Sequence, residues 1–219
     1  MTIGVARAAI PHTFGFDTVQ GWTQAELQAL HDHPWTPMRW IALFLGDPNA
    51  AAKRDAAFAL GMPILLVTFS RASGWVPSSS EGQVDGAGDV ERATSLGAPP
   101  TVHIMSDLEG CSGTVQTTED WANARGGAQK AAGYSPGIYV AAGQALQGVE
   151  LSSLVQTSYW QGLSVLTAPG APPGYTIEPS CGWGIRQLPH TVTLAGVNLD
   201  VNVIQYDWRG RLPTLWWPE

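Results

Sequence analysis

The sequence predicts an α/β fold, a single TIM-type (β/α) barrel that is irregular in its second half. Apolar stretches with strand character alternate with helix-like stretches from residue 14 onward, and this order favours parallel strands joined by helical crossovers. Seven or eight such strands in 219 residues suit a closed barrel. No linker or internal repeat divides the chain, so we expect residues 1–219 to form one domain with its core at about 14–207.

An open, doubly wound sheet is the alternative α/β architecture. Such a sheet usually carries a glycine-rich phosphate loop after its first strand. The residues in that place read DTVQGW (17–22) and contain no G-x-G-x-x-G pattern. The closed barrel is therefore the preferred architecture.

The first 140 residues supply five expected strands and the helices between them. Thr23 and Glu26 form the pattern of a capping box at the start of the first helix, and Gly61 and Gly97 are suited to end later ones. The expected strands cover 14–20, 40–46, 63–70, 101–109 and 135–140, and the expected helices cover 23–33, 49–61, 87–97 and 117–133.

The second half is less regular. A weak helical pattern covers 142–155, and a proline- and glycine-rich loop covers 167–180. Strands are expected at 157–163, 182–188 and 196–205, and no convincing helix joins the last two.

Composition excludes several classes of partner. The net charge is −7 and the few basic residues are scattered, which argues against a nucleic-acid partner. No apolar run approaches 18 residues, so no membrane span is expected, and the first residues lack the pattern of a secretory signal. Cys111 and Cys181 have no metal-ligand spacing. We expect no cofactor and no metal, and buried free thiols are preferred over a disulfide between these two cysteines.

Acidic side chains mark three of the expected strands. Asp107 and Glu109 are two residues apart, so they share one face of their strand, and Asp200 shares a polar face with Asn202. Asp17 stands near the end of the first strand. Active sites of barrels are built at the carboxyl ends of the strands, so four carboxylates are expected to meet at one mouth.

Clustered carboxylates favour acid–base chemistry, and two other interpretations stay open. Such a cluster can bind Ca²⁺ or Mg²⁺, and single acids at strand ends often cap helices or pair with arginine. Arg186 is the best candidate for an arginine partner in the sequence. The ten tryptophans are equally open between core packing and stacking on sugar rings.

Six short motifs follow one another over residues 14–205. They are G-x-D at 15–17, D-x-E at 107–109, G-Y-x-P-G-x-Y at 133–139, an aromatic strand at 159–161, W-x-x-x-Q at 183–187 and D-x-N at 200–202. Their order resembles that in the family 25 glycoside hydrolases, the lysozyme-type muramidases, and in the related glycoside hydrolase-like barrels. No separate wall-binding module is visible, which favours the second of these branches.

The resemblance implies roles for individual residues. Glu109 would donate a proton to the leaving oxygen, and Asp107 would stabilise the positive centre or orient a substrate N-acetyl group. Asp17 and Asp200 would set proton affinities and hold water or substrate. The expected substrate-binding residues are Tyr139, Trp160, Gln187, Trp22 and Asn202.

The expected function is cleavage of β-1,4 bonds in bacterial peptidoglycan, with the cell-wall glycan as partner. One alternative is a catalytically silent sugar-binding or structural barrel in a phage particle or envelope assembly, and another is an unrelated barrel hydrolase. The protein would be phage-encoded or exported by a non-classical route, and would act at the cell wall. Trp216 and Trp217 near the C-terminus suggest a hydrophobic clamp or a contact with another protein.

Overall fold

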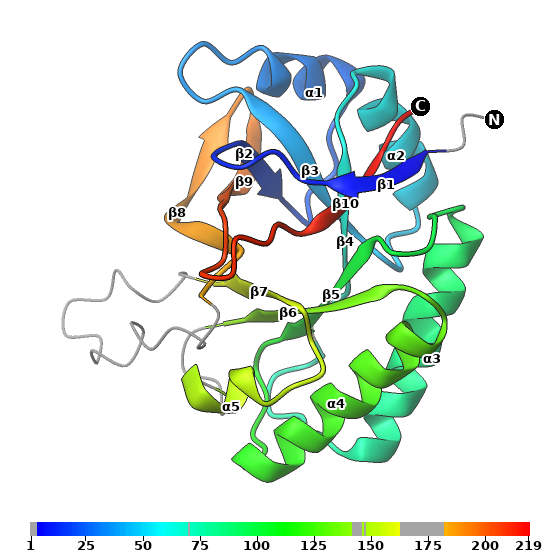
Figure 1. Ribbon diagram of the computed structural model, residues 1–219. Helices are drawn as coiled ribbons and strands as arrows, with labels where there is room; N and C mark the ends of the chain where they lie inside the picture. The colour runs from blue at the N-terminus through cyan, green and yellow to red at the C-terminus, as the bar shows by residue number, and fades with distance from the viewer. Residues whose placement is uncertain (1–3, 70, 142–145, 147, 163–181) are drawn as a thin grey trace.

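The computed structural model describes residues 4–69, 71–141, 146, 148–162 and 182–219 (Figure 1). Within these residues eight strands close into a barrel surrounded by helices, which confirms the predicted TIM-type fold. Each strand pairs with the next along the chain, and the last pairs with the first. The strands are β2 (Phe14–Asp17), β3 (Met38–Phe44), β4 (Ile64–Val67), β5 (His103–Leu108), β6 (Ser135–Val140), β7 (Ser158–Gln161), β8 (Ile185–Leu194) and β9 (Val197–Ile204).

Strand direction changes at the end of the barrel. Neighbouring strands from β2 through β8 run parallel, whereas β9 is antiparallel to both β8 and β2. Only Ala195 and Gly196 connect β8 to β9, and both have positive φ angles, 49° and 83°. Such a two-residue turn matches the twist of a hairpin, so these strands need no crossover helix.

Helices cover the outside of the barrel. They are α1 (Gln24–His31), α2 (Ala50–Ala59), α3 (Ser79–Ser95), α4 (Val115–Ala131) and the short α5 (Gly148–Ser152). The predicted capping box of α1 is present, because Thr23 Oγ1 accepts from the Glu26 amide at 3.2 Å and Glu26 Oε2 accepts from the Thr23 amide at 2.6 Å. None of the described helices combines the length and the apolar character that crossing a bilayer requires.

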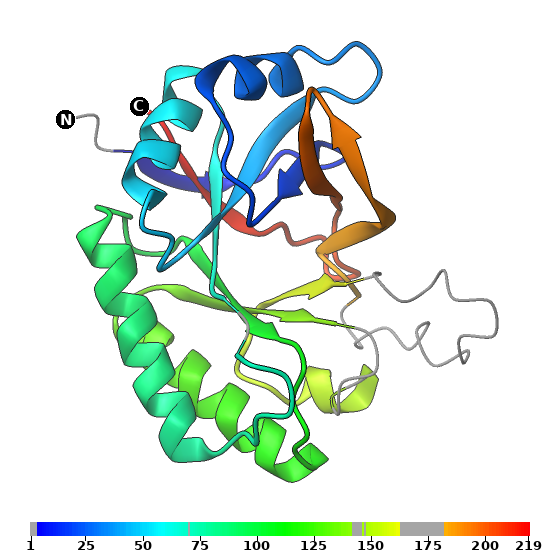
Figure 2. The same ribbon diagram turned by 180° about the vertical axis from the view of Figure 1, so that it is seen from behind.

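Helix α3 begins earlier than the sequence indicates. Ser78 caps it, and the helix therefore includes residues that read as a glycine- and serine-rich loop. Gly82 and Gly86 lie directly against the backbone of α4, where a Cβ would overlap the Trp121 carbonyl oxygen and approach the Arg125 carbonyl oxygen to 2.5 Å. Figure 2 shows the two helices side by side. Glycine, normally poor in helices, here allows their close packing.

Strands β1 (Val5–Ala8) and β10 (Thr214–Trp217), which the sequence did not indicate, form an antiparallel pair from the two ends of the chain (Figure 1). β10 joins the barrel sheet where Trp216 pairs with Ile64 of β4. Trp216 is 1% exposed, and its ring meets the ring of Phe58 edge to face at 5.1 Å. Trp216 is therefore a core residue, and of the two interpretations its burial favours a hydrophobic clamp over a contact with another protein.

Two predictions from the sequence fall on residues that the structure does not describe. The first is the proline- and glycine-rich loop at 167–180. The choice between a disulfide and free thiols depends on Cys181, which is also outside the described residues. Of the weak helix expected at 142–155, residues 148–152 are helical as α5.

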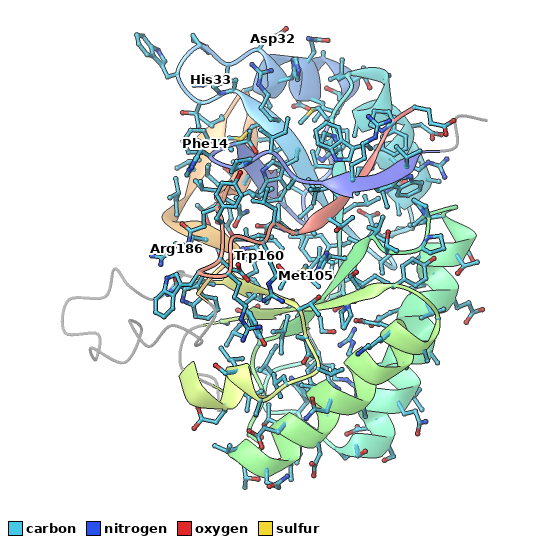
Figure 3. All side chains as sticks on the ribbon, viewed as in Figure 1. Phe14, Asp32, His33, Met105, Trp160 and Arg186 are labelled. Atoms are coloured by element: carbon cyan, nitrogen blue, oxygen red, sulfur yellow. The ribbon has the colours of Figure 1, made fainter. Side chains whose placement is uncertain are left out.

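Large apolar side chains fill the inside of the barrel below its mouth. Trp40, Met105 and Trp160 are all buried and belong to one luminal cluster (Figure 3). Gly15 of β2 faces the same lumen, and a Cβ on it would overlap the indole ring of Trp40. The glycine of the G-x-D motif is therefore required by packing, because it leaves the space that Trp40 fills.

We expect Gly15→Ala to lower the free energy of unfolding by about 1–3 kcal/mol, because the added methyl group overpacks the lumen. Thermal and urea unfolding would measure the change. Gly21→Ala is the matched control, since nothing lies within 4 Å of a Cβ at this exposed position. It should change stability by no more than about 0.5 kcal/mol. Equal effects of the two substitutions would contradict the packing explanation.

Candidate active site

A cavity of about 200 Å³ opens at the barrel mouth, where strands β2 to β7 end. Its wall includes the four acids expected from the sequence and three of the five expected sugar-binding side chains. These lining residues are Asp17, Asp107, Glu109, Asp200, Tyr139, Trp160 and Gln187. The structure therefore brings together residues that are as much as 183 positions apart in the chain (Asp17 and Asp200).

Asp107 and Glu109 reach the cavity from β5. Asp107 is 8% exposed, and its amide donates to Thr68 Oγ1 of the neighbouring segment at 3.0 Å. Glu109 follows the strand, and its carbonyl oxygen accepts from Trp75 Nε1 at 2.9 Å. These bonds fix the backbone on both sides of Leu108, whose own side chain packs outward in a separate cluster beside α4. The alternation predicted for the D-x-E motif is present.

Asp17 and Asp200 are direct partners across the β2–β9 pair. Because β9 is antiparallel, Asp200 reaches the mouth from the first half of its strand, whereas Asp17 is the last residue of β2. Thr191 Oγ1 donates to Asp200 Oδ1 at 2.6 Å. The hairpin therefore allows β9 to place a carboxylate at the same end as the parallel strands.

Asn202 connects the luminal core to Asp17. Trp160 Nε1 donates to Asn202 Oδ1 at 2.9 Å, and Asn202 Nδ2 donates to Asp17 Oδ2 at 2.7 Å. Asn202 is fully buried and is not in the cavity wall. The sequence suggested that it binds substrate, whereas its place in the structure suits orientation of the Asp17 carboxylate.

Burial, opposed by the hydrogen bond from Asn202 and assisted by the nearby charges of Asp200 and Glu109, raises the pKa of Asp17 to about 7. The mouth therefore holds a proton near neutral pH. Burial, followed by the surrounding carboxylates, also raises the pKa of Tyr139 well above its usual value. Tyr139 thus stays a neutral hydroxyl, and it donates to Gln187 Oε1 at 3.0 Å.

Four apolar lining residues were not identified from the sequence: Val19, Phe44, Val67 and Phe69. The rings of Phe44 and Phe69 stack at 4.7 Å with 17° between their planes, and Phe69 is 43% exposed. Both phenylalanines belong to runs that are apolar on both faces of the strand. Polar and apolar residues therefore do not alternate, and the sequence did not show which side chains face the mouth. Their common position at the end of consecutive strands was the available signal.

Two other residues expected at the site, Trp22 and Arg186, do not line the cavity. Trp22 is half-buried against the outer core, with Lys53 Nζ 5.8 Å from its ring centre, and does not line the cavity. Arg186 was the best candidate partner for the acids. It alternates with the inward-facing Gln187, and it lies on the outer face of β8 (Figure 3).

His103, the first residue of β5, lies in the lower lumen. It is 6% exposed, its Nδ1 accepts from the Thr214 amide at 2.8 Å, and burial lowers its pKa to about 4. It is therefore a neutral core histidine. Among the residues that the structure describes, no group of three or more His, Cys, Asp or Glu side chains is placed to hold a metal ion.

No protein-family model matches this chain, and neither does any curated protein. Several solved structures share its fold, among them the following three. The spore cortex lytic enzyme SleM of Clostridium perfringens has a TM-score of 0.62 at 14% identity, over 92% of this chain and 70% of that one. The catalytic domain of endolysin ply40 from Listeria monocytogenes bacteriophage P40 has a TM-score of 0.55 at 14% identity, over 90% and 95%. The modular autolysin LytC of Streptococcus pneumoniae, solved with a synthetic peptidoglycan ligand, has a TM-score of 0.54 at 13% identity, over 87% and 46%.

The chain thus shares its fold with a lytic enzyme, an endolysin domain and an autolysin. At 13–14% identity the likeness shows the fold alone, and the match spans less than half of LytC. What the site does must be argued from its own residues.

Proposed function

We propose that the protein is a muramidase-type glycoside hydrolase that cleaves β-1,4 bonds of bacterial peptidoglycan and belongs with the family 25 enzymes and their glycoside hydrolase-like relatives. The observation that carries the proposal is the set of four carboxylates around one cavity of about 200 Å³ with aromatic walls. The likeness to SleM, LytC and the ply40 domain, named as a lytic enzyme, an autolysin and an endolysin, supports the substrate class.

In this proposal Glu109 donates its proton to the bridging oxygen as the bond from the anomeric carbon to that oxygen breaks. Asp107, the most buried of the acids at the D-x-E motif, stabilises the positive charge that develops on the sugar or orients an N-acetyl group that attacks it. Water then completes the hydrolysis. Two carboxylates with different surroundings are the usual requirement for such acid catalysis.

Asp17 and Asp200 support this pair. With a pKa of about 7, Asp17 carries a proton through much of the neutral range, so the mouth holds one negative charge fewer than four carboxylates would give. Asp200 pairs with Asp17 across the two strands and accepts a hydrogen bond from Thr191 Oγ1. Crowding of carboxylates in this way keeps an acidic proton at the mouth, on Asp17.

Sugar contacts come from the flat rings of the cavity wall. Tyr139 packs edge to face on the buried Trp160 at 5.1 Å, and the stacked Phe44 and Phe69 form another part of the wall, where Phe69 is 43% exposed. Aromatic faces pack well on the apolar faces of sugars, and the hydroxyl of Tyr139 and the amide of Gln187 offer polar contacts. The proposed place of action is the cell wall, reached from a phage or by non-classical export, and the phage origin of the ply40 domain supports the first route.

The test is incubation of the protein with purified peptidoglycan from several bacteria, followed by a count of new reducing ends. Release of reducing ends is the expected result, and the anomer of the first product would then give the stereochemistry. No release from any wall, with the fold intact by circular dichroism, would contradict the proposal and favour a silent sugar-binding or structural barrel.

A further inference from the structure

A second cavity, of about 350 Å³, lies beside the barrel mouth, between the ends of β3 and β4 and the helices α3 and α4. Phe69 belongs to the walls of both cavities, so the two are adjacent. The first cavity is lined by carboxylates, whereas the second contains the three arginines Arg71, Arg92 and Arg125. Its chemistry therefore differs from that of the proposed catalytic cleft.

The two aspartates of this second cavity are already satisfied by neighbours. Asp89 is fully buried and receives Nε and Nη2 of Arg125 at 2.7 and 2.9 Å. Asp85 receives Nη2 of Arg71 at 2.5 Å and Nε1 of Trp121 at 2.9 Å. Two arginines are thus committed to two aspartates, and their charges balance.

Arg92 is the third arginine, and its ion pair with Asp89 is longer than those that Arg71 and Arg125 form with the two aspartates. Its Nη1 lies 3.9 Å from Asp89 Oδ1, beyond hydrogen-bond distance, and its side chain is 55% exposed. Its Nε lies over Gly46, where a Cβ would stand 3.7 Å away in ordinary van der Waals contact. A guanidinium with donors directed at a cavity is the usual partner of a carboxylate, which it binds through two parallel hydrogen bonds.

We propose that this arginine cavity is a subsite for the acidic peptide arm of the substrate, with a peptide carboxylate bound by Arg92. The inference rests on the proposed function in one respect, since the glycan in the neighbouring cleft must be peptidoglycan. Peptidoglycan carries short peptides with free carboxylates on every second sugar. A sugar seated at Phe69 would direct such a peptide into the arginine cavity, whose apolar wall includes Leu45 and Phe69.

The test compares the binding of two fragments by isothermal titration calorimetry. One is the disaccharide of peptidoglycan with its four-residue peptide, and the other is the same disaccharide after removal of the peptide. Neither fragment contains a glycosidic bond that a muramidase cleaves, so binding is measured without turnover. The wild type should bind the peptide-bearing fragment about tenfold more tightly, an advantage that salt should reduce.

Arg92→Gln should abolish most of this advantage and leave the affinity for the bare disaccharide unchanged, which also shows that the variant is folded. Arg92→Lys should keep part of it, since the charge remains and the planar fork is lost. Arg209→Gln, at an exposed position beyond the opposite end of β9, is the matched control and should keep all of it. Equal affinities of the wild type for the two fragments, or an unchanged ratio in Arg92→Gln, would overturn the proposal.

Failure of the peptide subsite can be distinguished from failure of the proposed hydrolase function. If peptidoglycan is cleaved but the two fragments bind equally, the peptide subsite is wrong and the hydrolase stands. If the ratio depends on Arg92 but no wall is cleaved, the subsite stands on a barrel that binds peptidoglycan without cutting it.

Discussion

Glu109→Gln is expected to reduce the release of reducing ends from peptidoglycan by about 100-fold or more, because the amide cannot supply the proton that the leaving oxygen needs. The substitution preserves the size of the side chain. It also leaves the backbone contact from Trp75 Nε1 to the Glu109 carbonyl oxygen intact, so the loop after β5 should keep its place. Initial rates of reducing-end release, measured beside circular dichroism spectra, would give the result.

Glu91→Gln is the control for this substitution, since Glu91 is exposed on α3, outside both cavities. It should retain the wild-type rate. An aryl glycoside with an acidic phenol as leaving group supplies a second comparison, because such a group departs without protonation. Glu109→Gln should be impaired far less on that substrate than on peptidoglycan. Equal impairment on both would show that Glu109 is not the proton donor.

The parts of the fold that sequence reasoning predicted correctly are those where local signals agree with packing. The capping box at Thr23 and Glu26 fixed the start of α1, and alternation along residues 197–202 separated the outward face from the luminal face of β9. Asp107 and Glu109 reach one cavity for the same reason, since two residues along a strand return the side chain to the same face.

The parts that could not be predicted depend on contacts distant in sequence. Strand β10 is four residues long and is stabilised by pairing with β1 from the other end of the chain, which no local pattern reveals. Helix α3 contains glycines that only the neighbouring α4 explains. Asn202 was placed on the correct face, but its depth behind the cavity depends on Trp160, a residue of another strand.

Asp17→Asn is expected to stabilise the protein above pH 7 and to impair the site. The folded state raises the pKa of Asp17 from an ordinary value of 3.8 to about 7. Between about pH 4 and pH 7 the folded protein therefore holds a proton that the unfolded chain has lost, so the wild type loses stability as the pH rises through this window. The loss is complete above pH 7. The amide has no proton to lose and can still accept from Asn202 Nδ2, so it avoids this cost.

Thermal unfolding of both proteins from pH 4 to pH 8.5 measures the difference. The variant should gain about 1–3 kcal/mol at pH 8 relative to the wild type and little or nothing at pH 4. Asp55→Asn is the control, because the side chain of Asp55 is 67% exposed on α2, and the difference it makes should not vary across this range. A stability difference for Asp17→Asn that does not vary with pH would contradict a buried proton on Asp17.

The same variant should cleave peptidoglycan more slowly, although it is the more stable protein at pH 8. If the Asp17 carboxylate served only to pack the barrel, the isosteric amide would pack equally well. The substitution would then raise stability without lowering the rate of cleavage. Loss of activity together with a gain in stability would mean that the barrel holds Asp17 at an energetic cost for the sake of the proton it carries. Full activity in the stabilised variant would instead make Asp17 a residue of the fold, and would leave the proton chemistry to Glu109, Asp107 and Asp200.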